Sequence, residues 1–385
     1  MPCAIEPGDP LPALRTEQQA LFNAGGIVFA HEFVASEGLG PVYIERSCVS
    51  CHAQGGIGGS DSLDDSNHFV QRFFTLGIDG TYNPLESLGG DILQTKSIAG
   101  LQPGCGVLPE SIPALATITS KRNPQALFGS GLIEAIPDAT ILGGAVDQGD
   151  GVKGRANLDD SGRRPGRFGW KAQGVSLVPF IAKVFRDIMG ITTPWSPIEN
   201  MAQGQPVLPG CSDADVGAPT PNDPDGSFVY SVSAWVALLA PPQPKNMDSE
   251  ATRGEHVFIS VGCNKCHTPT MLTGDYNLPL AGNPAMHIEA LSNKPVALYS
   301  DLLLHDMGPD LDDQVRVRLA KGRDFRTAPL WGLQLRIRFL HDGRARSPDE
   351  AIRMHGGEAQ IIRDRYYVVL AEDDRKAVLK FLSRL

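Results

Sequence analysis

The sequence predicts a mainly α-helical protein in two unequal halves, because one pattern occurs twice along the chain. The pattern is a helix, a C-x-x-C-H motif, a loop-rich stretch and a closing apolar helix. The motifs are Cys48–His52 and Cys263–His267, and the closing helices are expected in "FVYSVSAWVALLAPP" and "DDRKAVLKFLSRL". The prolines of "APPQPKNMD" indicate a linker between the halves. We therefore predict domains over residues 15–243 and 247–385.

The helix before each motif is predicted from spacing and capping residues. "SEATRGEHVFISV" begins with Ser249 as a helix N-cap and ends before Gly262. "TEQQALFNAGGIVFAHEF" carries apolar residues at helical spacing, namely Leu21, Ile27, Val28 and Phe33.

Composition adds limits on structure and partners. The chain has 385 residues with 42 Gly and 30 Pro, and the stretch from about 55 to 225 forms a loop-heavy insertion in the first half. A net charge of −10 argues against nucleic acid and anionic membranes and suits a basic protein partner. No apolar run approaches the length of a membrane span.

Three chemistries use paired cysteines, and the C-x-x-C-H motifs favour one of them. Ribbon-type zinc sites pair two C-x-x-C knuckles over a short separation, whereas these pairs lie in different halves. A thioredoxin-like thiol pair explains neither the adjacent histidine nor the duplication. Covalent haem explains both, since the thiols bond the haem and the next histidine binds its iron. We predict two haem c groups, attached at Cys48 and Cys51 and at Cys263 and Cys266, with His52 and His267 as proximal ligands.

The second axial ligand of each iron separates an electron-transfer haem from a reactive one. "SPDEAIRMHGGEA" predicts a short helix with Ser347 as N-cap and Gly356-Gly357 as its stop. His355 shares its apolar face with Ala351 and Ile352, so we expect His355 on the second iron, with Met354 as the rival. For the first iron, His68 follows His52 by sixteen residues in a Gly- and Asp-rich loop; it is either an iron ligand or a surface histidine.

The remaining cysteines and the haem chemistry bear on location. Cys105 and Cys211 lie in two Pro-Gly loops and either form a disulfide or stay as thiols. Haem c is attached outside the cytoplasm in bacteria, so we predict a periplasmic protein. Cys3 is either the remnant of a lipid anchor or an ordinary cysteine.

Several stretches resemble the bacterial di-haem cytochrome c peroxidase superfamily, and in particular its di-haem oxidoreductase branch. They include "LGPVYIERSCVSCHAQGGIGG", "RNPQALFGSGLIEAIPD", "GRFGWKAQ", "YSDLLLHDMGPDL" and "DFRTAPLWGLQLRIRFLHDGRARSPDEAIRMHGGEA". The resemblance implies two cytochrome c-like domains with haems facing across their interface. It also implies peroxide cleavage at the N-terminal haem and electron entry at the C-terminal haem from a small donor, a cytochrome c or a cupredoxin.

The resemblance extends to individual residues. Family members have a loop histidine with the spacing of His68 that caps the peroxidatic iron. They carry methionine where this chain has His355, and bis-histidine ligation should lower the potential of the second haem. Calcium between the domains is common in these peroxidases, and a homodimer is a further expectation.

Six further side chains are candidates for supporting roles. Glu134, a lone carboxylate in an apolar stretch, is the candidate proton donor to peroxide, or else a helix-capping group. Arg326, with Arg344 and Arg346, is a candidate for holding haem propionates. Trp170 or Trp331 is a candidate electron relay between the haems, or else core packing.

The predicted function is therefore reduction of hydrogen peroxide at the haem on His52, with electrons supplied through the haem on His267 and His355. Two alternatives stay open. One is an electron carrier with both irons six-coordinate, and the other is an enzyme that oxidises an organic or protein substrate.

Overall fold

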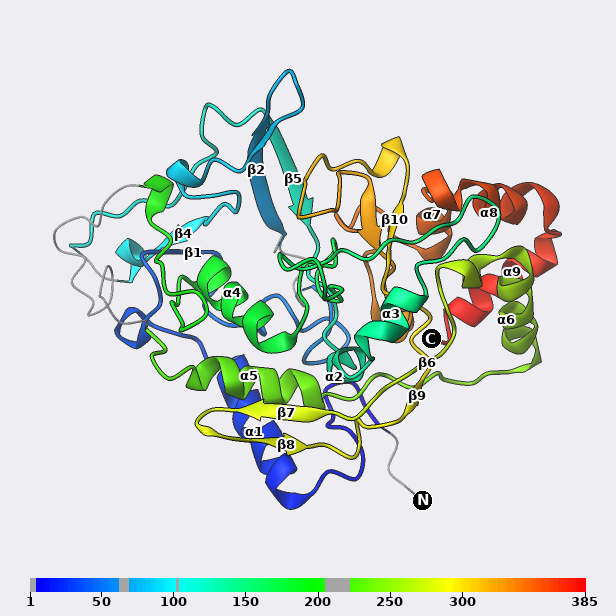
Figure 1. Ribbon diagram of the computed structural model, residues 1–385, viewed down its shortest axis with the longest axis horizontal. Coiled ribbons are helices and arrows are strands. Elements are labelled where there is room, and N and C mark those ends of the chain that lie inside the picture. The colour runs from blue at the N-terminus through cyan, green and yellow to red at the C-terminus, as the bar shows by residue number, and fades with distance from the viewer. Residues whose placement is uncertain (1–4, 62–68, 102–103, 205–221) are drawn as a thin grey trace.

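The computed structural model describes residues 5–61, 69–101, 104–204 and 222–385. Its longest regular elements are helices, connected by long irregular segments and short strands (Figure 1). This agrees with a mainly α-helical class and with the high glycine and proline content. None of the described helices is both long and apolar enough to cross a membrane.

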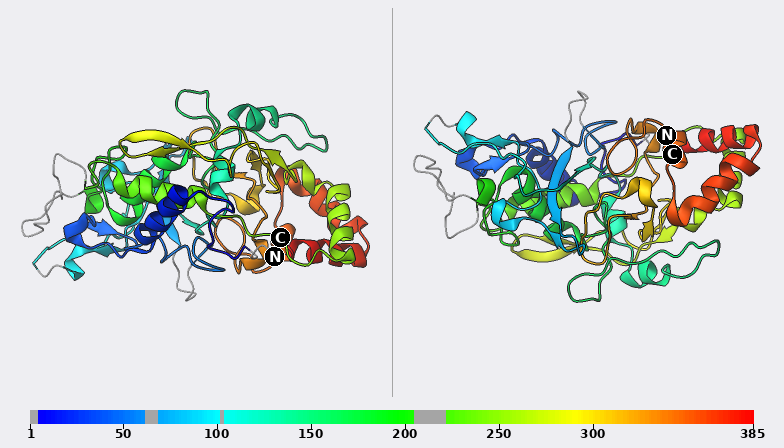
Figure 2. Two further views of the ribbon diagram at one scale, coloured as in Figure 1. Left: turned by 90° about the horizontal axis from the view of Figure 1, so that it is seen from below. Right: turned by 90° about the horizontal axis from the view of Figure 1, so that it is seen from above.

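Two helix pairs lie in different parts of the molecule, one at the bottom and one at the right-hand end in Figure 1, and Figure 2 shows the same separation. The first pair is α1 (Thr16–Ala30) against α5 (Ser227–Leu238), and the second is α6 (Ser249–Val261) against α9 (Glu372–Leu382). Each pair thus joins the helix before one C-x-x-C-H motif to the closing helix of the same half.

A glycine lets the two helices of each pair approach closely. At Gly25 a side-chain carbon would collide with the Ser231 carbonyl oxygen on α5, and at Gly254 it would collide with the Ala377 carbonyl oxygen on α9. Four residues after each glycine comes a buried phenylalanine, Phe29 or Phe258. The two halves therefore repeat at the level of single contacts as well as of motifs.

The predicted helix limits are close to those observed, but the apolar residues from which the first helix was predicted are not the ones that it buries. α6 covers Ser249–Val261 and stops at Gly262, although its N-cap is Asp248, whose carboxylate accepts a hydrogen bond from the Ala251 amide at 2.9 Å. In α1 the buried residues are Gln18, Phe22, Gly25 and Phe29, whereas Ile27 is 73% exposed. The face is rotated because the close approach of α5 at Gly25 decides which side is buried.

The other elements are short. The helices are α2 (Ser130–Glu134), α3 (Asp138–Gly143), α4 (Leu177–Met189), α7 (Pro348–Arg353) and α8 (Gln360–Asp364). Two-stranded antiparallel pairs are β1 (Val42–Tyr43) with β4 (Lys96–Ser97), β6 (Met271–Leu272) with β9 (Pro295–Val296), β7 (Asn277–Leu280) with β8 (Asn283–His287), and β10 (Leu304–Asp306) with β11 (Asp324–Arg326).

A three-stranded antiparallel sheet lies inside the stretch that was expected to be loop. Its order is β3 (Tyr82–Asn83), β2 (Val70–Leu76), β5 (Ile118–Arg122), with Val70 opposite Arg122. The sequence did not predict it, because its pairing joins segments about fifty residues apart.

Each half contributes a segment, here called an arm, that packs against the other half. The β7–β8 hairpin lies beside α1 and α5 (Figure 1), and the Gln18 side chain donates to the His287 carbonyl oxygen at 3.2 Å. In the opposite direction, Arg155 of the first half pairs with Leu304 of β10. As a result, the largest buried apolar cluster contains residues of both halves, from Phe29 and Trp235 to Leu278 and Trp331.

Cys105 is disulfide-bonded. Its predicted partner Cys211 lies outside the described residues, as does Cys3. The pairing of Cys105 with Cys211 therefore stays a prediction.

Candidate active site and haem cavity

Each C-x-x-C-H motif folds into one tight turn. The His52 amide donates to the Cys48 carbonyl oxygen at 3.1 Å, and the His267 amide donates to the Cys263 carbonyl oxygen at 2.9 Å. A turn of this kind brings both thiols and the imidazole to one side of the chain, which is what covalent attachment to a flat ring requires.

Backbone carbonyls orient both imidazoles. Because a carbonyl can only accept, the Nδ1 atoms are the donors: His52 Nδ1 lies 3.2 Å from the Gly59 oxygen and His267 Nδ1 lies 2.9 Å from the Tyr299 oxygen. Phe29 and Phe258 lie beside these rings, with ring centroids at 6.4 Å and 6.2 Å. Fixing Nδ1 in this way is typical of histidines that bind metal through Nε2.

His355 is arranged in the same manner, although it lies two residues after the end of α7 at Arg353 and not within the predicted helix. Its Nδ1 lies 2.7 Å from the Ala351 carbonyl oxygen, one helical turn earlier. Ser347 caps the helix as predicted, accepting from the Glu350 amide at 3.2 Å. Burial lowers the pKa of His355, and it lowers that of His267 to about 4, so both rings are neutral, the form that binds metals.

One cavity of about 1180 Å³ reaches both motifs. Ordinary ligand sites measure roughly 300–1,000 Å³, so this cavity is large. Its wall contains both cysteines and the histidine of each motif, and it also contains Ala351, Ile352 and His355. Met307 also lines the cavity, whereas Met354, the predicted rival of His355, is not part of the wall.

The cavity wall carries cations that lack acidic partners. Arg326 and Arg336 line it, and among the described residues no carboxylate forms a salt bridge with either guanidinium. Arg326 instead donates to the Gly169 oxygen at 3.0 Å, and Arg336 to the Pro329 oxygen at 2.9 Å. The Nε of Arg336 is buried without a hydrogen-bond partner, and burial lowers the pKa of both guanidinium groups to about 10.

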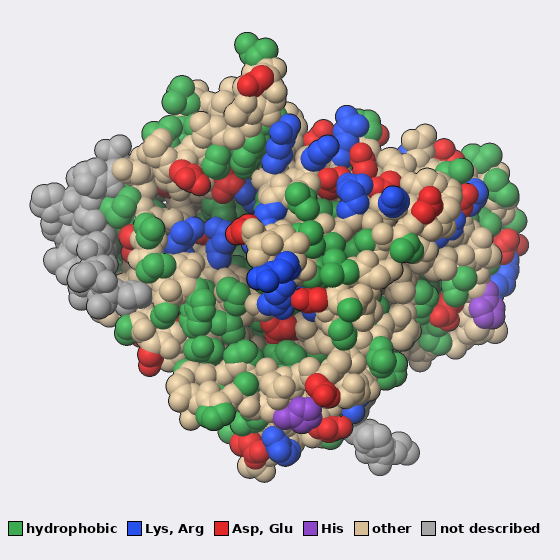
Figure 3. Space-filling view, in the orientation of Figure 1, with side chains coloured by type: hydrophobic (Ala, Val, Ile, Leu, Met, Phe, Trp, Pro, Cys, Tyr) green, Lys and Arg blue, Asp and Glu red, His purple; other side chains and the backbone are tan. Residues whose placement is uncertain are grey.

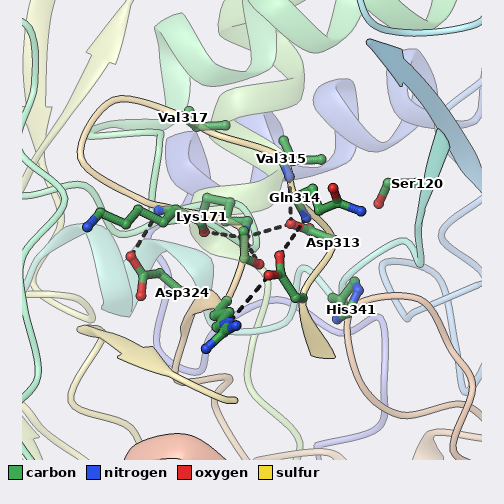
Figure 4. Close-up of polar contacts among 12 residues, drawn as sticks. Ser120, Lys171, Asp313, Gln314, Val315, Val317, Asp324 and His341 are labelled. Atoms are coloured by element: carbon green, nitrogen blue, oxygen red, sulfur yellow. Dashed lines mark hydrogen bonds and ion pairs between the residues drawn. The ribbon is translucent and has the colours of Figure 1, made fainter. Parts of the chain in front are cut away.

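A second cationic group lies where the two halves meet (Figure 4). The ammonium group of Lys171 is 3.0 Å from Asp313 and donates to two backbone oxygens at 2.8 Å, while its side chain is 2% exposed. Arg122 hydrogen bonds to the same Asp313 carboxylate, so two cations share one anion. His341, stacked on Phe325 with centroids at 4.2 Å, adds no charge because burial lowers its pKa to about 2.

This excess of positive charge fits two haems. Each haem carries two propionate carboxylates, and buried charges need partners of opposite sign. On the outer face, too, Lys and Arg side chains gather between α4 and β10 (Figure 3). Arg336 and Lys171 were not predicted as part of the site. One sequence feature could have indicated Arg336 as a site residue: it lies in the mostly apolar stretch "LQLRIRFL".

The same facts bear on the other cysteine chemistries. Burial raises the pKa of Cys48, Cys51 and Cys263 to about 12, whereas reactive thiols have lowered values. No cluster of three or more His, Cys, Asp or Glu suited to a metal ion occurs in the described ranges. The geometry thus gives no support to a thiol pair or to a zinc knuckle, and calcium between the domains stays a prediction.

The structure brings some of the remaining predicted residues to the cavity and leaves others away from it. Trp170 and Trp331 both line it, and the Trp170 indole donates to the Asn123 oxygen at 2.8 Å. Arg344 does not line it, because its exposed side chain pairs with Asp342 at 2.5 Å. Arg346 is likewise outside the wall, and His68 lies outside the described residues.

Glu134 lies behind the cavity wall. Its carboxylate accepts from the Leu177 amide at 2.6 Å, at the start of α4, and from the Tyr276 hydroxyl at 2.5 Å. Burial raises its pKa, as the sequence analysis expected, and these hydrogen bonds oppose the rise. The contacts are those of the capping alternative, and they tie α2 and α4 to the segment before β7.

Comparison with known proteins identifies the family. A family model described as "di-haem oxidoreductase, putative peroxidase" matches residues 116–385. The chain belongs to this di-haem oxidoreductase family. The matched range contains Cys263–His267 and His355, while Cys48–His52 precedes it. No curated protein matches the chain.

Solved structures similar to the chain include three with nearly complete coverage. A MauG-like protein associated with microbial copper homeostasis is 16% identical over 100% of this chain and 94% of its own, with a TM-score of 0.42. The diheme peroxidase BthA from Burkholderia thailandensis is 14% identical over 100% and 89%, with a TM-score of 0.42. Hydrazine synthase from Kuenenia stuttgartiensis is 14% identical over 100% and 96%, with a TM-score of 0.38.

Proposed function

We propose that this di-haem oxidoreductase is a c-type peroxidase. Hydrogen peroxide is reduced to water at the haem on His52, and electrons arrive through the haem held by His267 and His355. Each turnover consumes one peroxide, two electrons and two protons and releases two waters. When bound, the haems supply the site for peroxide and the stores for electrons.

The observation that carries this proposal is the single cavity with a C-x-x-C-H turn at each end. Cys48 and Cys51 hold the first haem, and Cys263 and Cys266 hold the second. The chain orients the imidazoles through Gly59, Tyr299 and Ala351. The ends differ in one respect: a second histidine, His355, is held over the second motif.

Other parts of the wall support the two haems. Arg326 and Arg336 are proposed to neutralise propionates, since in the described part of the chain no carboxylate forms a salt bridge with either. Trp170 and Trp331 are the aromatic side chains we propose as electron relays, because both line the shared cavity. His68 keeps its proposed role as a displaceable ligand of the first iron.

The setting of the reaction is part of the proposal. Haem c attachment places the protein in the periplasm, with Cys3 as a candidate lipid anchor. The electron donor is a small redox protein, a cytochrome c or a cupredoxin, and the net charge of −10 favours a basic one. A homodimer and a calcium ion between the domains complete the expectation.

The test combines spectroscopy with single-turnover kinetics. Optical and EPR spectra of the holo-protein at defined potentials report the haem count, spin state and axial ligands of each site. The half-reduced protein, in which only the haem of higher potential carries an electron, is then mixed with hydrogen peroxide and a reduced cytochrome. We expect one peroxide to oxidise two donor molecules.

Each outcome separates the candidate functions. Two low-spin haems, slow cyanide binding and no peroxide-dependent donor oxidation would overturn the proposal and leave an electron carrier. Peroxide consumption that modifies an organic or protein substrate without oxidising the cytochrome would instead identify a substrate-oxidising enzyme.

A further inference from the structure

The segment of residues 299–308 connects the two sides of the second haem site. At its start, the Tyr299 oxygen holds His267, and the Asp301 amide donates to the Cys266 carbonyl oxygen at 2.9 Å. The Ser300 amide donates to the Thr268 carbonyl oxygen at the same distance. This end of the segment is therefore bound to the proximal motif along three successive residues.

The other end of the segment is bound to the chain that follows His355. The Asp306 amide donates to Glu358 at 3.2 Å, and Glu358 lies three residues after His355. Gly308 and Gly357 pack so closely that a side-chain carbon on Gly308 would lie 2.8 Å from the Gly357 nitrogen. Only Gly356 and Gly357 separate Glu358 from His355 along the chain, so this contact lies close to the histidine in sequence.

His305 joins both ends and is 2% exposed. Its Nε2 lies 2.8 Å from Asp301 and its Nδ1 lies 2.8 Å from Glu358, so both nitrogens face carboxylates. Cys266 Sγ lies 3.6 Å from Nδ1. Burial alone would lower the pKa of His305, but the hydrogen bonds to Asp301, Cys266 and Glu358 raise it to about 12. His305 is thus a doubly protonated donor to both carboxylates.

Residues of the first half of the chain also contact His305 and its neighbours. Arg155 exchanges two backbone hydrogen bonds with Leu304, at 2.9 Å and 2.8 Å, and its guanidinium donates to Glu358 at 3.1 Å. Gly154 is adjacent, and a side-chain carbon there would lie 2.9 Å from the His305 ring. His305 is therefore enclosed by three segments distant in sequence.

We propose that His305 is a positioning residue that fixes the separation between His267 and His355 and so keeps the second iron six-coordinate. The Asp301–His305–Glu358 bridge crosses directly from the proximal side to the distal side. This inference rests on the proposed function, in which His267 and His355 bind the same iron. Buried hydrogen-bonded partners of metal ligands commonly set the orientation of those ligands.

The test uses the full-length holo-protein with His305→Gln, because glutamine cannot donate to both carboxylates from a rigid ring. We expect a weaker low-spin bis-histidine EPR signal and faster cyanide binding at the second haem. The expected change is about 10- to 100-fold, the range for losing an outer-shell partner of a metal ligand. Haem content and the thermal unfolding midpoint are measured on each sample.

Two further variants make the result specific. Glu358→Gln preserves the shape of a partly buried side chain and removes the distal carboxylate, so it should speed cyanide binding in the same direction. It also carries the test if His305→Gln does not accumulate. His256→Gln, on the exposed side of α6, is the matched control and should leave the spectrum and the rate as in the unsubstituted protein.

The outcomes distinguish this inference from the function on which it rests. An unsubstituted protein with a bis-histidine signal, and variants with the same signal and the same cyanide rate, would overturn the role of His305 alone. An unsubstituted protein without such a signal at the second haem would overturn the assignment of His355, and this inference with it. Faster cyanide binding in both variants, together with an unchanged rate in the control, supports the role of His305.

Discussion

At the residue scale, His355 is the residue that we propose decides the character of the second haem. Its ring is fixed through Nδ1, which leaves Nε2 for the iron. We expect His355→Met to raise one of the two haem potentials, because a thioether favours the reduced iron more than imidazole does. The rise should be on the order of 0.1 V, within the roughly 0.8 V that axial ligands span.

A potentiometric titration followed optically checks this prediction, with His256→Met as the exposed control. Two unchanged potentials in His355→Met would show that another group, such as Met307 of the cavity wall, binds the iron.

Glu134 offers a direct comparison between a structural and a chemical role. Because its carboxylate caps α4 and accepts from Tyr276, we expect Glu134→Gln to lower the free energy of unfolding by about 1 kcal/mol. Peroxide turnover by the folded variant should change little. Steady-state kinetics decide: a loss of about 10²–10⁴-fold, typical of a missing general acid, would restore Glu134 as the proton donor.

Lys171 gives the protein a distinct pH dependence. Burial lowers its pKa from 10.5 to about 8, with Asp313 opposing the shift. Between these values the unfolded chain binds more protons than the folded one, so stability should rise as pH increases across that window. The contribution is at most about 3 kcal/mol.

Urea unfolding at several pH values between 7.5 and 10 measures this slope. Lys171→Met should flatten it, while Lys376→Met, on an exposed lysine of α9, should not. Equal slopes in all three proteins would contradict the burial of a titrating Lys171.

Much of the candidate site was predictable from residue types. The cysteines proposed to attach haem, the two histidines proposed as proximal ligands and His355 were predicted from local motifs, and the structure brings His52, His267 and His355 to one cavity. Arg336 and Lys171 were not predicted, because what distinguishes them is the lack or sharing of a carboxylate partner. That property depends on tertiary neighbours rather than on the local sequence.

At the element scale, the α1–α5 pair and the α6–α9 pair cross in the same way, each at a glycine. Gly254 on α6 faces the Ala377 backbone, and a methyl group there has no space. We expect Gly254→Ala to lower the free energy of unfolding by about 1–3 kcal/mol, the usual cost of overpacking. Gly143, at the end of α3, has open space around it, so Gly143→Ala should stay within about 0.5 kcal/mol.

Chemical unfolding of the holo-protein, followed by haem absorbance, measures both variants. Equal stability of Gly254→Ala and Gly143→Ala would mean that α6 and α9 do not approach as described.

Helix ends were predicted better than helix faces. α6 and α7 begin at side-chain caps and α6 ends at Gly262, which are local signals, whereas α7 ends at Arg353, three residues before the predicted stop at Gly356. The face of α1 is chosen by α5, more than two hundred residues later, and the short strands depend on equally distant pairings. Such choices need the tertiary structure and leave little trace in local periodicity.

At the scale of the whole molecule, net charge should govern the encounter with the donor. With −10 on the chain, reduction by a basic cytochrome should slow about tenfold or more as salt rises from low to physiological strength. Stopped-flow mixing with a basic and an acidic cytochrome compares the two cases. A rate independent of salt for both would show that the acidic surface does not guide the donor.

Because each half packs an arm against the other, the predicted division into 15–243 and 247–385 follows the repeat of motifs in the sequence but does not divide the apolar core. Each haem motif lies in its own half, as expected, yet the largest apolar cluster is common to both. The repeat of motifs is visible in sequence, whereas the shared core forms where helices of the first half, such as α5, pack against segments of the second half, such as β7.

The exposed, irregular stretch 243–248 between the halves has a consequence for a nicked chain. A protease that cuts there would sever the only covalent route through the linker but not the interlocked arms. The β7–β8 hairpin would stay seated on α1 and α5, and Arg155 would stay paired with Leu304. The two fragments should thus behave as a complementing pair, migrating together under native conditions and separating only in denaturant.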